Sequence, residues 1–191
     1  SNGERLRRGY TTGTCAALAA KAAAELLLCG TAPENVSVLT PAGVTVTVQP
    51  EEVHCCDSTS AAASATAARA AAGTNAPSTT AAETGPTAHA TIIKDAGDDY
   101  DVTNGTRVCA FVTLCDQDIS IDGGIGVGRV TCPGLDQPVG NAAINSGPRA
   151  MIRAALEDAA LEAGYLGGFN VVVEVPEGVE IGRKTFNPSL G

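Results

Sequence analysis

The chain has 191 residues, of which 44% are hydrophobic and 17% charged, enough for one sizeable globular domain or two small ones. Its formal net charge of −9 argues against general nucleic-acid binding, because phosphate backbones are bound through an excess of Lys and Arg. No apolar run approaches the roughly 20 residues that span a bilayer, and the start SNGERLRRGY lacks a signal-like apolar stretch. We therefore expect a cytoplasmic protein without a membrane partner, in which residues 1–3 resemble a cloning scar.

The first predicted helix covers residues 14–29, and Gly30 is predicted to end it. Because Ala and Leu make up nearly all of it, the helix is expected to be buried on most faces. Directly ahead lies GYTTGT, Gly9 to Thr14, with three threonine hydroxyls and free backbone N–H groups at one helix start. One threonine suffices as an N-cap, so this loop indicates a site for an oxygen-rich ligand.

Alternating valines on both sides of Pro-Ala-Gly predict a β-hairpin over residues 35–50. The run HCCD, His54 to Asp57, then places four possible metal ligands side by side. Adjacent residues seldom converge on one tetrahedral ion, and no second ligand cluster follows. A solvent-facing turn is the favoured interpretation, no metal site is predicted, and the seven cysteines are expected to be reduced.

From residue 58 to residue 90 bulky apolar residues vanish, while Ser, Thr, Ala and Gly dominate. Such a stretch buries little apolar area. We interpret it as a flexible or poorly packed segment, with room for a short alanine helix near residues 61–72. The two histidines, His54 and His89, both border it, and neither favours a catalytic triad.

Two strands are predicted over residues 89–94 and 106–114, on either side of a loop rich in Asp, Gly and Asn. A second helix is predicted over residues 148–163, capped by Ser146 or Gly147 and ended by Gly164. One apolar stripe runs along it, formed by Met151, Ile152, Ala155, Leu156 and Ala159. The run FNVVVEVP follows as a core strand. This pattern predicts an α+β fold, a mixed sheet with helices packed mainly on one face.

Four segments concentrate glycine with polar side chains: Gly9–Thr14, Asp95–Gly105, Gly123–Gly140 and Asn141–Arg149. Glycine permits close backbone approach, so such loops can offer N–H groups to anions. The run GGIGVGRV does not favour a dinucleotide fingerprint, which needs a helix after it, because residues 127–131 read as extended and Pro133 follows. A Walker phosphate loop is also missing, since the TTGT turn has no lysine.

The run DAGDDYDVTNG holds four carboxylates, at Asp95, Asp98, Asp99 and Asp101. They are able to bind Mg²⁺ or act as general bases, or simply to cap turns. Arginines also gather near the glycine-rich segments, at positions 5, 7, 8, 129, 149 and 153. They suit carboxylate or phosphate binding, and the alternative is ordinary surface charge.

Four motifs, in order along most of the chain, resemble the cobalt-precorrin-5B C-1-methyltransferase family of anaerobic cobalamin biosynthesis. They are LRRGYTTGTCAALAAKAAAELL, KDAGDDYDVTNGT, GIGVGRVTCPGLDQPVGNAAINSGPRAMIRAALE and the terminal NPSLG. Residues 51–90 do not resemble the family clearly. The position of Tyr100 usually holds proline in the similar family motif.

The resemblance implies methyl transfer from S-adenosylmethionine to carbon C-1 of a cobalt-corrinoid substrate, giving cobalt-precorrin-6A. A corrinoid ring is a flat apolar disc with acetate and propionate carboxylates at its rim, so its binder needs guanidinium groups, hydroxyls and backbone N–H groups. The substrate-binding candidates are Tyr10, Thr11, Thr12, Thr14, Arg129, Asp136, Asn145 and Arg149. In-line displacement at a sulfonium needs positioning more than acid–base help, and if a base assists, the candidates are Asp95, Asp98 and Asp101.

The family also implies a fold resembling the second domain of ribosomal protein S5. Family chains are longer and continue into a glycine-rich segment taken to bind S-adenosylmethionine, so we expect residues 4–191 to be an N-terminal corrinoid-binding domain with the donor site beyond Gly191, folded but inactive alone. A homodimer is left open. Two alternatives remain: a phosphate-binding, small-molecule kinase-like domain that uses GYTTGTCAA as an anion loop, and a non-catalytic binding domain.

Overall fold

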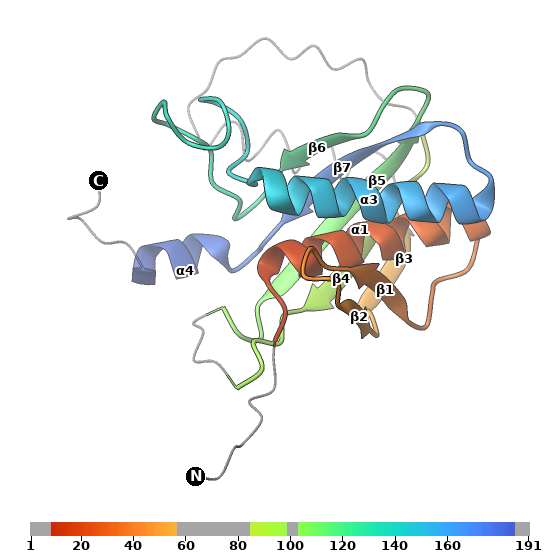
Figure 1. Ribbon diagram of the computed structural model, residues 1–191, viewed down its shortest axis with the longest axis horizontal. Helices are drawn as coiled ribbons and strands as arrows, with labels where there is room; N and C mark the ends of the chain where they lie inside the picture. The colour runs from red at the N-terminus through yellow and green to blue at the C-terminus, as the bar shows by residue number, and fades with distance from the viewer. Residues whose placement is uncertain (1–8, 57–84, 99–102, 186–191) are drawn as a thin grey trace.

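The computed structural model describes residues 9–56, 85–98 and 103–185 of the chain (Figure 1). The predicted alanine helix near residues 61–72 lies outside this described part, as does Asp101. The arginines at positions 5, 7 and 8 lie outside it as well. The fold below is that of the described residues.

A five-stranded sheet forms the centre of the fold, with the strand order β3-β4-β5-β7-β6. Its strands are β3 (Glu52–Cys56), β4 (Thr87–Ile93), β5 (Arg107–Cys115), β6 (Ser120–Gly123) and β7 (Gly168–Glu174). Neighbouring strands run antiparallel except β6 and β7, which run parallel because a helix connects them. The sheet is therefore mixed, as predicted.

Two long helices, α1 (Thr12–Cys29) and α3 (Ser146–Ala163), cover one face of this sheet. In Figure 1 they lie side by side in front of the strands and run in the same direction, so both begin at the same end of the molecule. Alternate residues of the three central strands join the core beneath them, as the period of a strand requires: Ala88, Ala90, Ile92, Val108, Ala110, Val112, Phe169, Val171 and Val173. The predicted α+β architecture is confirmed.

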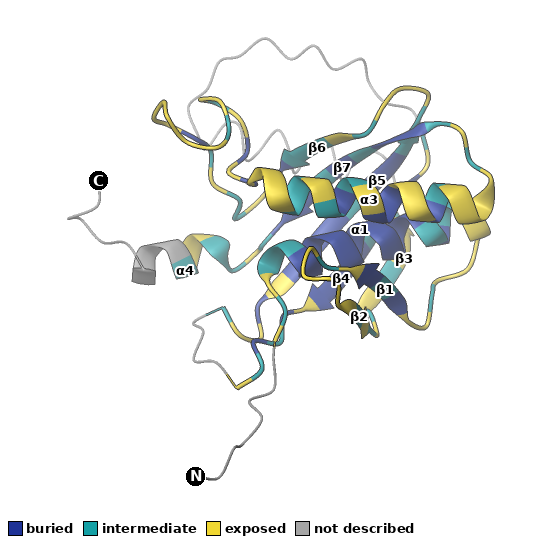
Figure 2. Ribbon diagram, in the orientation of Figure 1, coloured by how far each residue is buried: buried dark blue, intermediate teal, exposed yellow. Residues whose placement is uncertain are grey.

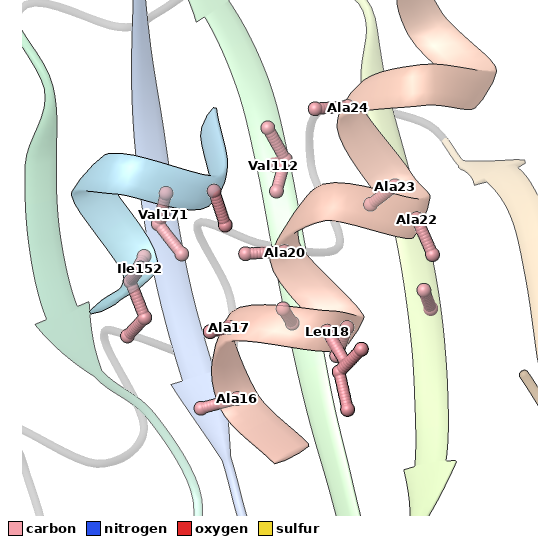
Figure 3. Close-up of a cluster of buried hydrophobic side chains, with 14 of the residues drawn as sticks. Ala16, Ala17, Leu18, Ala20, Ala22, Ala23, Ala24, Val112, Ile152 and Val171 are labelled. Carbon is pink, nitrogen blue, oxygen red and sulfur yellow. The ribbon is translucent and has the colours of Figure 1, made fainter. Parts of the chain in front are cut away.

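Small side chains bring α1 close to the sheet and to α3. Figure 3 shows Ala16, Ala17 and Ala20 pointing from α1 toward Ile152 of α3 and Val171 of β7. All five residues are buried, and in Figure 2 most of α1 has the dark blue of buried residues. Alanine loses no side-chain entropy in a helix, so the sequence that permits this close packing also favours the helix itself.

By length and composition α1 is the one described helix that could cross a membrane, with 18 residues and a mean hydropathy of 1.3. However, 67% of it is buried inside the protein, and its lysine, Lys21, is buried in an ion pair with Asp158 of α3. This is the packing of a core helix. The finding also corrects the expectation that no apolar run comes near the length of a membrane span.

The predicted hairpin is confirmed and forms a separate two-stranded sheet from β1 (Val36–Leu39) and β2 (Thr45–Val48). Its turn contains Gly43 in a left-handed conformation, with φ at 74°. Val36 and Val38 are buried and belong to the main core, so the hairpin packs beside α1.

The structure corrects the prediction around residues 52–90. Where the sequence predicts a solvent-facing turn at residues 54–57, residues 52–56 form the edge strand β3, paired with β4. Strand β4 begins at Thr87, inside the segment 58–90 that is predicted to be flexible or poorly packed, and Thr87, Ala88 and Ala90 are buried. The sequence analysis also predicts neither β6 nor helix α4 (Gly178–Thr185).

Helix α3 begins two residues before its predicted start, and its N-cap is Asn145 rather than Ser146 or Gly147. Both helices end as predicted, at left-handed glycines: Gly30 has φ at 77° and Gly164 at 66°. The predicted apolar stripe of α3 is confirmed for four residues, which are buried, while Met151 is half-buried: Ile152, Ala155, Leu156 and Ala159.

Candidate functional site

The start of α1 uses two of its three threonines within the fold. Thr11 is the N-cap, and its Oγ1 accepts a hydrogen bond from the backbone N of Thr14 at 3.1 Å. The hydroxyl oxygens of Thr11 and Thr14 lie 3.0 Å apart, and Thr14 is buried. Thr12 is half-buried, and its hydroxyl has no hydrogen bond within the described part of the chain. One hydroxyl and first-turn N–H groups therefore remain for a ligand.

The segment ahead of α1 packs directly against the loop that follows β4. The backbone N of Tyr10 donates a hydrogen bond to the carbonyl oxygen of Asp95 at 2.9 Å. A Cβ added to Gly9 would lie 2.0 Å from the carbonyl carbon of Ala96. Because any residue with a Cβ would clash with Ala96 at this position, glycine at position 9 is what lets these two glycine-rich loops meet.

The starts of the two helices also touch each other. A Cβ added to Gly13, in the first turn of α1, would lie 2.8 Å from Cγ of Pro148, in the first turn of α3. Each helix start carries about half a positive charge from its aligned peptide dipoles. Two such starts side by side form a place where an anion meets several N–H groups at once.

A carboxylate of the protein already occupies part of the α3 start. Asp136 accepts hydrogen bonds from the backbone N and the Oγ of Ser146, at 2.6 Å and 2.8 Å, and so caps the helix from ten residues upstream. Hydrogen bonds from Gln137 and then from Ser146 lower the pKa of Asp136. The N-cap residue itself, Asn145, is exposed and its side chain makes no capping bond.

Arg129 holds the glycine-rich loop that follows β6. Its Nη1 pairs with Oδ1 of Asp122 at 2.6 Å, and its Nη2 donates to the carbonyl oxygen of Gly123 at 2.8 Å. The side chain is only 9% exposed, and its Nε is buried with no hydrogen-bond partner in the described part of the chain. An isolated bridge pairs Arg129 with Ala142, so this arginine ties the two limbs of the loop together.

Arg149 makes three bonds to backbone carbonyl oxygens, of Ile144 at 2.7 Å, Ile121 at 2.9 Å and Ala142 at 3.2 Å. Burial lowers the pKa of this guanidinium, which stays protonated at neutral pH. The interactions of both predicted arginines are thus largely internal. They fix the loop of residues 121–144 against the start of α3 and place positive charge behind it.

The aspartate-rich loop also makes local bonds. Oδ1 of Asp95 accepts from the backbone N of Gly97 at 2.8 Å, and Oδ1 of Asn104 accepts from the backbone N of Ala96 at 2.9 Å. Asp98 is exposed. These are the turn-capping bonds that the sequence offers as the alternative to catalysis, and the catalytic role of Asp95, Asp98 and Asp101 stays a prediction.

The sequence analysis does not identify Lys94, a buried lysine beside this loop, as a candidate residue. Lys94 is 7% exposed, and its Nζ donates to Oγ1 of Thr103 across the loop. Burial raises the pKa of the Cys15 thiol, one turn into α1, to about 12, although the charge of Lys94 opposes that rise. The signal available in the sequence is the position of Lys94, at the end of an apolar strand and directly before Asp95.

The predicted glycine-rich segments thus gather at one end of the fold. The loop of residues 9–14 contacts Ala96 on one side and Pro148 on the other, and Asp136 joins the loop of residues 123–140 to the α3 start. Figure 1 shows the described parts of these segments at the end of the sheet where both helices begin. The arrangement suits the holding of an anionic ligand by helix starts and hydroxyl groups.

These observations define an α+β domain whose glycine-rich loops meet at the end where its two long helices begin. The family model described as CbiD matches residues 1–83 and 73–191, which together span the chain. The chain belongs to the CbiD family.

Several curated relatives share the name cobalt-precorrin-5B C(1)-methyltransferase. The protein from Ruminiclostridium cellulolyticum is 40% identical over 190 residues, covering 100% of this chain and 42% of that protein. The protein from Prosthecochloris aestuarii is 43% identical over 190 residues, covering 97% of this chain and 44% of its own length. The chain therefore spans less than half the length of these curated relatives.

A crystal structure of a cobalamin biosynthesis protein (cbiD) from Archaeoglobus fulgidus has a similar fold. It superposes with a TM-score of 0.61 at 31% sequence identity, over 97% of this chain and 49% of that chain. The mixed sheet with its helices is thus shared with a solved member of the family.

Proposed function

We propose that this chain is the substrate-holding part of a cobalt-precorrin-5B C(1)-methyltransferase of cobalamin biosynthesis. The observation that carries the proposal is the identity of 40% to 43%, along nearly the whole chain, to relatives that bear this name. Because the chain spans 42% to 44% of those relatives, the methyltransferase activity is proposed for the whole protein. The gathering of the glycine-rich loops at one end supports the assignment of substrate binding to this part.

In this proposal the paired helix starts hold carboxylates at the rim of the corrinoid ring. Thr12 offers a hydroxyl that bonds to no other described residue, and the exposed Asn145 offers a side-chain amide. Tyr10, Thr11 and Thr14 shape the loop around these groups. Arg129, Arg149 and Asp136 act behind them, since their described bonds fix the loop and the α3 start that the ligand would touch.

The methyl donor in this proposal is S-adenosylmethionine, whose sulfonium supplies a methyl group to an in-line nucleophile. No described residue is assigned to holding it. The task of this part is then orientation, because a correctly placed acceptor carbon lowers the barrier more than an added acid or base does. If a proton must leave C-1, Asp98 is the exposed described carboxylate on the neighbouring loop, with Asp95 and Asp101 as the other candidates.

The proposal also includes a cytoplasmic location, a small-molecule corrinoid partner and no nucleic-acid or membrane partner. The net charge of −9 supports the expectation that the chain does not bind nucleic acid. The likeness to the second domain of ribosomal protein S5 and the homodimer both stay predictions. The kinase-like domain and the non-catalytic binding domain stay the alternatives that the following experiment separates.

The test is a titration of the 191-residue chain with cobyrinic acid, a cobalt corrinoid with free carboxylates, followed by absorbance and by thermal unfolding. We expect saturable binding that Thr12→Val weakens about tenfold, because a hydrogen bond to a charged group contributes about 1.5–3 kcal/mol. The matched control is Thr31→Val, at the opposite end of α1, which should bind like the unchanged chain. Absent binding supports a non-catalytic domain of another kind, and stabilisation by ATP without binding of the corrinoid supports the kinase-like alternative.

A further inference from the structure

The two histidines of the chain face each other on neighbouring strands. The 191 residues contain only two, His54 on β3 and His89 on β4. The antiparallel register places them directly opposite one another, and their ring centroids lie 4.9 Å apart. Directly opposed residues of an antiparallel pair point to the same side of the sheet, so both imidazoles project from one face.

A carboxylate completes the cluster. Glu52 lies two residues before His54 on β3 and therefore shares its face. One ligand atom from each of Glu52, His54 and His89 lies within 4.8 Å of the other two. Two imidazole nitrogens and one carboxylate oxygen form the donor set of several three-ligand zinc sites, and imidazole also suits copper, nickel and cobalt.

We propose that Glu52, His54 and His89 bind one divalent first-row transition-metal ion, for which Zn²⁺ is the reference probe. The neighbours of His89 on β4, Ala88 and Ala90, are buried in the core beneath the helices, so the cluster lies on the opposite face of the sheet. Glu52 and His54 are exposed. The three side chains leave coordination positions that water or an added ligand would fill.

His89 is suited to this role by its surroundings. Its Nδ1 is buried and has no hydrogen-bond partner among the described residues, so coordination by this imidazole breaks no described hydrogen bond at that atom. The ring centroids of Phe111 on β5 and His89 lie 4.6 Å apart, so Phe111 packs against the imidazole and restricts its orientation.

The local charge also favours a cation. Two neutral imidazoles and one carboxylate carry a single negative charge, on a chain whose formal net charge is −9. A tilted ring pair can instead be ordinary cross-strand packing, and the free cysteines of the chain are rival zinc ligands. Cys55 is the closest rival in sequence, and the pleat of β3 places it on the other face from His54. The experiment below therefore distinguishes metal binding by the histidines from ring packing without a metal and from zinc binding by a cysteine.

The experiment uses the 191-residue chain without a polyhistidine tag, in its reduced form. Zn²⁺ is titrated by calorimetry, and the imidazole ¹⁵N resonances are followed by NMR, where only two ring systems contribute. We expect one ion per chain and a shift of both ring systems. His54→Gln, at an exposed position, should weaken binding at least tenfold, and Glu52→Gln should weaken it less.

His89→Gln should also abolish tight binding, and its fold is checked by circular dichroism because His89 packs on Phe111. Cys55→Ser is the matched control and should bind Zn²⁺ like the unchanged chain. Weak binding above millimolar concentration, no shift of the imidazole resonances, or a loss of binding in Cys55→Ser but not in His54→Gln would each overturn the proposal.

Discussion

The two ends of the paired helices α1 and α3 use glycine in different ways. At the end where the helices stop, Gly30 and Gly164 adopt left-handed conformations, and a Cβ added to either would meet nothing within 4 Å. At the end where the helices start, a Cβ on Gly9 or Gly13 would lie 2.0 Å or 2.8 Å from a neighbouring segment. The first pair ends helices, and the second pair permits contact between chain segments.

This difference shows where the fold has been shaped to bring loops together. Glycines that only end a helix are common and carry no functional information. Glycines that allow two loops to touch at a helix start place several N–H groups and hydroxyls in one region. The end at which both helices start is therefore the candidate site, and the opposite end serves as its natural control.

The largest expected effect comes from a contact glycine of the loop after β6. In Gly126→Ala the added Cβ would lie 1.7 Å from the carbonyl oxygen of Val175 at a φ of +74°. Strain and overpacking together should cost about 3 kcal/mol of the free energy of unfolding. Gly30→Ala, with a similar φ and open space, should cost about 1 kcal/mol. Urea unfolding measures both, and equal losses would contradict the distinction between the two kinds of glycine.

The next effect concerns the arginine that holds the loop. Arg149→Met removes three bonds to carbonyl oxygens and should cost about 2 kcal/mol, because charge-assisted bonds are among the stronger ones. Arg153→Met is the matched control. Arg153 makes one bond to a carbonyl oxygen, that of Ile119, and an ion pair with Asp118, which is 85% exposed, so a smaller loss of about 1 kcal/mol is expected. If both variants unfold at the same urea concentration, Arg149 does not anchor the loop.

A smaller effect is expected at the cap of α1. Thr11→Ala removes the oxygen that accepts from the backbone N of Thr14, and the loss of such a cap costs about 1 kcal/mol. Thr31→Ala, just beyond the end of the same helix, should stay within about 0.5 kcal/mol of the unchanged chain. A thermal scan distinguishes them. A fall in the unfolding temperature for Thr31→Ala as large as that for Thr11→Ala would speak against the capping role.

The smallest effect is a change in acid sensitivity. The pKa of Asp136 is lowered in the folded chain by the bonds from Gln137 and Ser146, so its contribution to stability is present above the ordinary aspartate pKa. That contribution is lost as the pH falls below about 3.9 and through the lowered value. Asp136→Asn should therefore be less stable than the unchanged chain at pH 7, and the difference should shrink near pH 3. A difference that is constant with pH would exclude the ionised cap.

The elements with strong patterns could be predicted from the sequence. The alanine-rich α1, the valine hairpin and the stripe of α3 all carry periodicity that local composition dictates. The edge strand β3 could not be recognised, because Val53 is the only bulky apolar residue among residues 52–56 that joins the core. Strand β6 is four residues long and merges with a glycine-rich loop, so its pairing with β7 depends on tertiary contacts.

Of the candidate site, too, only a part could be predicted from the sequence. Glycines, threonines and arginines in the loops predict a ligand-binding region. Composition alone does not show that Arg149 bonds to three carbonyl oxygens or that Asp136 caps α3. The opposition of His54 and His89 depends on the register of two strands separated by a long segment. Such a register is a property of the whole sheet.

The most direct test of the central claim is to map the backbone amides that respond to cobyrinic acid in two-dimensional ¹H–¹⁵N NMR spectra of the 191-residue chain. Binding at the shared helix starts predicts the largest shifts at residues 12–14 and 146–149, and unchanged signals at Gly30 and Gly164. Shifts that concentrate at the opposite end of the helices, or spread evenly over the chain, would contradict the account.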